Sequence, residues 1–333
     1  MATLSDLNRI AIVSEATPGT TPATPLFENL RLLSESVTST NNNVDSGELD
    51  PSRGLSDTIK AGADVGGTIE AYCVYDSSYI EAILSVLGAP VVWPSTGSSG
   101  ATTQGTTVET FTLERTIQNA DARQSYARYA GLSFSSVSWD FAPNDPLTMT
   151  FGVMGGAITV AEDTAVSGDA QIDGVAQVYA VPAPLDALPM TGDQVGLTWT
   201  AGTAALATAL NGSEITAMSI TIDSQNREID EVGQTASDVV LGKLAVGITF
   251  TSLFEGNAIK DAELDNTDTN NQPELNVTMT DSALNVYTLN FPRVKILQAT
   301  AITPTTNTDV VYEVEAVALV ETNVVCTFTA AQG

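Results

Sequence analysis

The residues with the clearest chemical potential in this sequence are two groups of carboxylates in its second half. The first, Asp261, Glu263 and Asp265, alternates as the leading ligands of a calcium-binding loop do. Such a loop also requires glycine at its sixth position and glutamate at its twelfth, where this chain has Asn266 and Gln272. A solvated acidic face therefore explains this run better than a calcium site does.

The second group, Glu228, Asp230 and Glu231, has the residue types of a general acid and a general base. Paired-carboxylate catalysis needs surroundings that move the two pKa values apart, usually apolar burial of one carboxyl group. The group lies in a polar loop, where we expect nothing apolar to produce that difference. We therefore predict no catalysis here.

Other chemistries lack their usual residues. The 333 residues include no histidine, which removes the commonest general base, the commonest zinc ligand and every Ser/His or Cys/His nucleophile pair. Gly62, Gly66 and Gly67 sit at the start of a strand pattern without the following helix that a phosphate-binding loop needs. These glycines predict a close strand approach or a bulge instead. We expect no enzyme, no cofactor and no metal.

Composition narrows the class of protein. With 12 basic and 40 acidic residues, the formal net charge is −28, which disfavours binding to phosphate-rich partners and to anionic membrane surfaces. The chain is 43% hydrophobic and 16% charged, so it should fold. Its longest small-apolar stretch, Ala204 to Leu210, is far shorter than a membrane helix, so we expect a soluble chain. Cys73 and Cys326 lie far apart and predict buried free thiols.

Alternation of apolar and polar residues dominates the chain and predicts a mainly β fold of half-buried antiparallel sheets. One helix is predicted over about Tyr79 to Leu87, because Ile80, Ile83, Leu84 and Leu87 follow helical spacing. Ser78 and Glu81 match a capping box at its start, and Gly88 can close its end.

The order of predicted elements repeats at low identity. Strand, polar loop, strand, helix and strand occur at residues 34–38, 39–64, 65–74, 79–87 and 111–114, and again at 219–223, 224–245, 246–254, 259–264 and 277–280. Each copy continues with a strand whose alternation changes phase, after Phe134 and after Phe291, which indicates a β-bulge or a change of faces. We predict two tandem domains, 1–160 and 195–333, joined by a linker and surface extension at 161–194. Chance matching of short β runs is the alternative.

In this order, the motifs resemble the tail tube (major tail) proteins of long-tailed, siphovirus-type bacteriophages. The resemblance rests on Glu15 to Pro22, on residues 30–38 and 62–70, and in the second half on residues 242–253 and 287–294. Each motif consists of common turn and strand residues. Their order over nearly the whole chain carries the resemblance.

The resemblance implies β-sandwich or barrel domains, each with a short flanking helix, that assemble into rings and stack into a hollow tube. The tube would carry the genome from capsid to host, so DNA would pass through the lumen without sticking. The implied partners are other copies of the chain, a tail terminator and tail-tip proteins, with no membrane. The implied location is the virion tail, assembled in the host cytoplasm.

The resemblance also implies a long loop in each domain that reaches the next ring. The first candidate is the loop at residues 41–61, with Glu48, Asp50, Arg53, Asp57 and Lys60. Its second-domain counterpart spans residues 225–242 and carries Arg227, Glu228, Asp230 and Glu231. These charges either pair across a ring interface or are simply solvated, and the sequence leaves both readings open.

If six tube domains make one ring, a chain with two such domains closes a homotrimer with pseudo-sixfold symmetry. A hexamer of whole chains is the alternative, with the second half decorating the outside. The acidity then either lines the channel and repels DNA or faces outward and serves solubility. A different function, a tandem β-sandwich adhesin or receptor-binding protein, would need clustered exposed aromatics, whereas Trp93, Trp139 and Trp199 are scattered.

Overall fold

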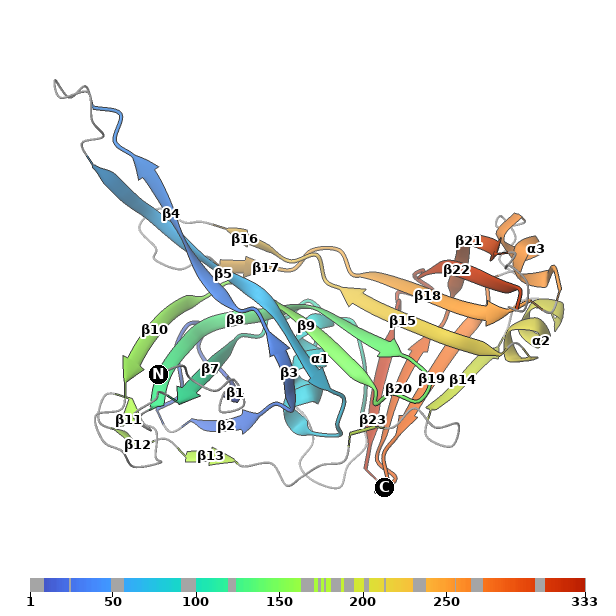
Figure 1. Cartoon of the computed structure of the whole chain (residues 1–333), viewed down its shortest axis with the longest axis horizontal. Coiled ribbons are helices and arrows are strands. Elements are labelled where there is room, and N and C mark those ends of the chain that lie inside the picture. Colours follow the sequence, from blue (N-terminus) through green and yellow to red (C-terminus); the bar gives the residue numbers. More distant parts are fainter. Residues whose placement is uncertain are drawn as a thin grey trace.

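The structure, a computed structural model, describes residues 9–23, 25–48, 57–90, 100–118, 124–162, 171–172, 175–176, 178–180, 187–188, 195–200, 204–212, 214–229, 238–254, 256–264, 272–302 and 309–332. Strands dominate these residues, accompanied by three short helices (Figure 1). The predicted mainly β fold is confirmed.

The first half and the segment after it contribute the following elements in chain order. They are β1 (Arg9–Ser14), β2 (Leu26–Asn29), β3 (Leu32–Glu35), β4 (Thr38–Asp45), β5 (Thr58–Tyr72), α1 (Ser77–Val86), β6 (Gly100–Thr103), β7 (Phe111–Gln118), β8 (Gln124–Phe141), β9 (Thr148–Met154), β10 (Ala157–Glu162), β11 (Gln171–Ile172), β12 (Val175–Ala176) and β13 (Val178–Ala180).

The second half continues with a similar succession. It consists of β14 (Val195–Thr200), α2 (Ala204–Gly212), β15 (Ile215–Asp223), β16 (Arg227–Ile229), β17 (Asp238–Val240), β18 (Ala245–Leu253), α3 (Ala258–Leu264), β19 (Glu274–Thr280), β20 (Val286–Phe291), β21 (Val294–Ile302), β22 (Val311–Ala318) and β23 (Thr327–Ala331).

One wide antiparallel sheet, which we call the central sheet, runs through both halves. Its order is β3 with β4, then β5, β9, residues 133–141 of β8, β15, β18, β22 and β21. The two halves join where β8 pairs with β15. On one side of this junction, the first half supplies β3 with β4, β5, β9 and β8. On the other side, the second half supplies β15, β18, β22 and β21.

Two further sheets provide the other layer. In the first half, β13, β2, β1, β7, the first part of β8 and β10 form one of them. The other consists of β14, β19, β20 and β23 from the second half, with β6 from the first half added at the β23 edge, at the lower right in Figure 1. Aromatic contacts fill the core: the Phe134 ring lies 5.0 Å from Phe111 and 5.5 Å from Phe151, and Trp199 lies 5.8 Å from Phe250.

The phase slip in the long strand of each copy is confirmed as a change of surroundings. In β8 the pairing with β9 skips from Phe134 to Ser136, so Ser135 is an extra bulged residue. In the second half, β20 ends at Phe291 and β21 begins at Val294, and these two strands belong to different sheets. In each copy the alternation of apolar residues changes phase because the chain passes from one sheet of the sandwich to the other at this point.

The two halves share one scheme of strand pairing. The pairs β1·β7, β7·β8, β8·β10, β3·β5, β5·β9 and β9·β8 recur as β14·β19, β19·β20, β20·β23, β15·β18, β18·β22 and β22·β21, all antiparallel. Two register shifts recur as well: Leu32/Ser34 corresponds to Ile215/Ala217, and Phe134/Ser136 corresponds to Ile296/Gln298.

The predicted helix is present as α1, but the predicted capping box is wrong. The N-cap is Asp76 without a side-chain cap bond, and Ser78 lies buried inside the helix with no hydrogen-bond partner for its hydroxyl. Glu28 of β2 instead accepts hydrogen bonds from the Ser77 hydroxyl and the Ser78 amide. A distant strand thus supplies the cap that local sequence was expected to supply.

The predicted end of this helix is confirmed. Gly88 has a φ of 66°, its amide donates to the Ser85 carbonyl, and the Ala89 amide donates to the Leu84 carbonyl. This is a Schellman motif, for which glycine is favoured. The later helical run is also present as α3. Helix α2 was not predicted, because its sequence indicated only a short apolar stretch.

Burial on α1 gives a testable pH dependence. Burial, assisted by Glu28, Asp76 and Glu109, raises the pKa of Glu81 from 4.5 to about 7. The folded state therefore binds the proton of the Glu81 carboxyl group more tightly than the unfolded state does. The stability that this proton contributes is complete below pH 4.5 and is lost as pH rises through 7. We expect Glu81→Gln to stabilise the fold at pH 8 by up to about 3 kcal/mol and to have almost no effect at pH 4.

Urea unfolding at the two pH values measures this difference. The exposed substitution Glu313→Gln controls for the loss of one charge. An equal effect of Glu81→Gln at both pH values would contradict the prediction.

The predicted linker at 161–194 lies largely outside the described residues. Of its described parts, β13 pairs in parallel with β2, and the Leu188 amide donates to the Cys73 carbonyl. Cys73 and Cys326 are buried and free, as predicted. Among the described residues, no helix has the length and apolar character needed to span a membrane.

Candidate channel and assembly surfaces

The solvent face of the central sheet is its broadest polar surface. One row across the sheet runs through Thr148, Asp140, Ser219, Thr249, Glu315 and Gln298, which are paired in register from β9 to β21. All are exposed or half-buried. Their neighbours on the same strands point to the other side and are buried, including Phe141, Met218, Phe250 and Val314. The alternation thus separates a polar wall from the core.

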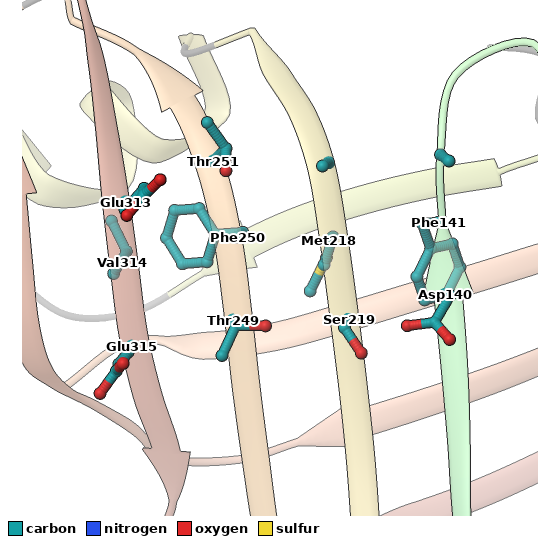
Figure 2. Close-up of a pocket in the computed structure, with 12 residues that line it drawn as sticks. Asp140, Phe141, Met218, Ser219, Thr249, Phe250, Thr251, Glu313, Val314 and Glu315 are labelled. Atoms are coloured by element: carbon teal, nitrogen blue, oxygen red, sulfur yellow. The ribbon is translucent and has the colours of Figure 1, made fainter. Parts of the chain in front are cut away.

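Charge on this face is predominantly acidic. In the described strands its charged residues are Asp64, Glu70, Asp140, Asp223, Glu313, Glu315 and Lys295. Figure 2 shows Asp140, Glu313 and Glu315 around an open depression of about 410 Å³ over β8, β15, β18 and β22. A surface of hydroxyls and carboxylates repels anions and offers phosphate few cationic contacts.

Strands β4 and β5 leave the body as a long two-stranded arm, at the upper left in Figure 1. We define the arm by residues 41–48 and 57–62. Val44 and Ile59 face each other across it and are 58% and 56% exposed. An apolar pair on a projecting arm indicates a surface that another molecule can cover.

The arm contains the first predicted inter-ring loop. Glu48, Asp57 and Lys60 are exposed on it, whereas Asp50 and Arg53 lie outside the described residues. The Asp57 carboxylate accepts a hydrogen bond from the Thr58 amide at 2.8 Å. The two described ends of the predicted loop are thus paired strands.

Of the three glycines singled out in β5, Gly67 is the one whose position excludes a side chain. A Cβ on Gly67 would lie 2.6 Å from the Ser36 carbonyl oxygen, so β3 and β4 pass too close for any side chain. The register shifts where Asn42 pairs with Gly62 and Asn43 pairs with Lys60, which makes Ala61 a bulge. Close approach is thus confirmed at Gly67 and a bulge lies next to Gly62, whereas a Cβ on Gly62 or Gly66 would meet no atom closer than 3.6 Å.

The second predicted loop is a shorter hairpin, formed by β16 and β17. Arg227 is exposed on it, while the Glu228 carboxylate accepts a hydrogen bond from the Gly155 amide at 2.9 Å. Asp230 and Glu231 lie outside the described residues. Glu228 therefore ties the hairpin to the first half of the chain.

The acidic run near residue 263 also serves the fold. The Glu263 carboxylate accepts hydrogen bonds from the Lys260 ammonium and from the Ala299 amide, the latter at 2.9 Å. Lys260 in turn donates to the Ala299 carbonyl at 3.0 Å. Asp265 lies outside the described residues, and no group of three His, Cys, Asp or Glu side chains within them is placed to hold a metal ion.

The two edges of the central sheet end in similar side-chain contacts. At the β3–β4 edge, the Val37 amide donates to Glu35 at 3.0 Å, and the Val37 carbonyl accepts from Arg115 at 3.4 Å. Glu35 and Arg115 are themselves 3.0 Å apart. At the β21 edge, Glu263 and Lys260 contact Ala299 in the same way. Sequence reasoning missed both contacts, and only the i,i+3 spacing of Lys260 and Glu263 was a local signal.

Two of the three tryptophans belong to the core. Trp139 is 0% exposed and Trp199 is 2% exposed, while Trp93 lies outside the described residues. Neither Trp139 nor Trp199 can form the exposed aromatic platform that a carbohydrate-binding adhesin would need.

The Glu15 to Pro22 motif is a surface turn held by its buried first residue. Glu15 accepts hydrogen bonds from the Gly19 amide at 2.8 Å, the Thr112 hydroxyl at 2.6 Å and the Gly131 amide at 2.9 Å. We expect Glu15→Ala to lower the free energy of unfolding by about 2–4 kcal/mol, because it leaves these donors without their acceptor. Urea denaturation measures the loss, with the exposed Glu321→Ala as control. Equal midpoints for the two variants would contradict this role.

The chain matches the model of a known protein family. The family of phage tail tube proteins matches residues 5–318, a range that includes the arm and every strand of the central sheet. No curated protein compared with the chain matches it.

Proposed function

The chain belongs to the phage tail tube protein family, and on that basis we propose that it forms stacked rings whose bore conducts the DNA genome to the host. The family is structural and not enzymatic, and it implies self-assembly into a tube in the virion tail. The observation that best supports the finer proposal is the central sheet, with one buried face, one acidic polar face and an open edge at each end.

We assign the solvent face of the central sheet to the channel wall. DNA in a conduit must pass without adsorbing, and a carboxylate-lined wall gives phosphate no cationic foothold. Screening limits this repulsion to about 8–10 Å from the wall at physiological salt, so the wall prevents sticking without closing a wider bore. Asp140, Glu313 and Glu315 are the residues that we place on it.

We also propose that the chain holds two copies of one tube domain, at 1–160 and 195–333. The shared pairing scheme and the two recurrent register shifts support this duplication. Both halves contribute to the same sheet, which favours a homotrimer with pseudo-sixfold symmetry over a hexamer whose second halves decorate the outside.

The arm is the proposed contact between stacked rings. Its exposed Val44 and Ile59 supply apolar surface for the neighbouring ring, and Glu48, Asp57 and Lys60 supply charges at its rim. Tail terminator and tail-tip proteins would meet the same surfaces at the two ends of the tube.

Negative-stain microscopy and mass measurement test the assembly. We expect stacked rings with an axial hole and a ring mass of three chains of 34.7 kDa. Six chains per ring would support the hexamer instead. A protein that stays monomeric under all assembly conditions would refute the tube proposal.

The channel wall has its own test in Glu315→Lys. Because this position is exposed on the polar face, we expect normal tubes that bind double-stranded DNA at about 50 mM salt and release it by about 200 mM. Glu321→Lys, on a turn between β22 and β23, makes the same charge change away from the wall. DNA binding by both variants, or by neither, would argue against the assigned wall.

A further inference from the structure

We infer that the two acid–base pairs Glu35–Arg115 and Glu263–Lys260 are removable caps on the open edges of the central sheet, displaced when a second copy of this chain pairs with each edge. This inference rests on the proposed ring assembly and specifies its interface. The occupant of each edge is the opposite edge of another copy, so that β21 of one chain pairs with β3 and β4 of the next.

The capped atoms are those that a neighbouring strand would use. Ser36 bonds back to β5 through Thr68, so the next residue, Val37, turns its amide and carbonyl outward. On the other edge, the amide and carbonyl of Ala299 both bond to side chains of α3 and not to β22. In each case a carboxylate replaces the missing acceptor and a cation replaces the missing donor, and at Val37 the buried Tyr129 hydroxyl also donates to the carbonyl, at 3.4 Å.

Such caps answer a general problem of edge strands. An unpaired row of amides and carbonyls invites pairing with any exposed strand, and charged side chains at an edge reduce that hazard. Displacing a side-chain cap breaks no strand pairing, and the two side chains of each cap already form an ion pair with each other, so neither charge is left alone when a strand arrives. The capped edge therefore suits a subunit that must remain single until a correct partner is present.

The junction inside the chain shows what a closed edge looks like. There, β8 pairs with β15, with Trp139 opposite Ile220, Ser138 opposite Thr221 and Val137 opposite Ile222. By the shared register shifts, β21 corresponds to β8, and β3 with β4 corresponds to β15. The junction is thus an internal template for the contact between chains.

The template fixes a register. Gln298 corresponds to Ser136, and Ser34 corresponds to Ala217. When the register of the β8–β15 junction is transferred with these correspondences, three pairs follow between two chains: Val37 with Ala301, Thr38 with Thr300 and Ser39 with Ala299. The Ser224 amide bonds to the Ser135 carbonyl, which sets the hydrogen-bonded positions of the junction. On that pattern Val37 and Ala299 fall at hydrogen-bonded positions.

The residue at the position of Glu35 differs between open and closed edges. Glu35 corresponds to Met218, which is buried where β15 is paired. An acid thus occupies the open edge and an apolar residue occupies the closed one. Hydrogen bonding from Lys260 lowers the pKa of Glu263, which keeps the second cap charged.

A cysteine pair tests the register. Thr38 and Thr300 are both exposed and, in the inferred ladder, form a non-hydrogen-bonded pair with Cα atoms about 4.5 Å apart, within reach of a disulfide. We expect Thr38→Cys/Thr300→Cys to give covalently closed rings on oxidation. The buried Cys73 and Cys326 should not compete. Thr40→Cys/Thr300→Cys, two residues out of register, is the matched control.

Removing the caps tests their role. We expect Glu35→Met and Glu263→Ala each to lower the protein concentration needed for self-association about tenfold or more, with Glu313→Ala as a control of equal charge loss. Light scattering measures the threshold, and thermal unfolding confirms that each variant is folded. An unchanged or higher threshold in both folded variants would overturn the role of the caps.

The outcomes separate the two levels of inference. Rings that resist cross-linking through Thr38 and Thr300, or that cross-link equally in the control, would overturn the interface while leaving the tube intact. Absence of rings from the unmodified chain would refute the proposed function itself.

Discussion

A chain lacking residues 43–59 is expected to fold normally and to form no long tubes. The structure makes this deletion simple, because Asn42 pairs with Gly62 and the shortened chain leaves only Lys60 and Ala61 between them. Changing these two residues to Asn-Gly gives the preferred two-residue hairpin loop. The described residues of the deletion, 43–48 and 57–59, project from the body, so thermal unfolding should shift by only a few degrees (Figure 1).

The loss of tubes should be nearly complete because the arm carries the proposed stacking contact. Burying Val44 and Ile59 would contribute about 1.5–3 kcal/mol each, and stacking repeats that contribution for every chain in a ring. We expect single rings or short stacks by negative-stain microscopy. Val44→Ser/Ile59→Ser keeps the arm but removes its apolar pair, and should shorten tubes without abolishing them. Full-length tubes from the deletion would refute the stacking role.

Sequence reasoning located this arm as a polar loop and missed that its flanks are strands. Asn41 to Asn43 and Gly62 opposite them have poor strand propensity, yet they pair in the ladder on both sides of the bulge at Ala61. Each segment is held by its partner across the hairpin, which alternation of apolar residues cannot reveal. The close approach itself was predicted correctly at Gly67, because a site with no room for a Cβ requires glycine in the sequence.

In helix α1, too, the features set by neighbouring residues were predicted and those set by distant residues were not. Its apolar spacing and its glycine end are local and were predicted. Its start was misplaced because Glu28 caps it from β2, and Tyr287 contributes by accepting a hydrogen bond from the Asp76 amide. The edge caps were equally inaccessible, since Glu35 and Arg115 lie 80 positions apart.

The fold shows where several of the carboxylates lie. Composition alone allowed the carboxylates to face a channel or the exterior. The strand register places Asp140, Glu313 and Glu315 on one continuous face, while Glu263 and Glu35 serve at the edges. The same residue type thus supports two proposed roles, one that repels a passing polyanion and one that protects unpaired backbone.

Replacing one edge residue should block ring closure more severely than any change on the wall. Ala301 is exposed, and its amide points away from β22, on the same side as that of Ala299 two residues earlier. Proline is tolerated on an edge strand when the lost amide faces outward. We therefore expect Ala301→Pro to fold with a nearly unchanged unfolding temperature, and to lack the donor that the neighbouring chain requires.

The effect multiplies around the ring. A missing interchain hydrogen bond that leaves a carbonyl unsatisfied costs about 2 kcal/mol, which weakens each interface about 30-fold. A closed trimer repeats that loss at three interfaces, so rings should be absent at concentrations where the unmodified chain assembles fully. Ala301→Val keeps the amide and should still form rings. Analytical ultracentrifugation measures both, and normal rings from folded Ala301→Pro would show that β21 is not the edge that closes the ring.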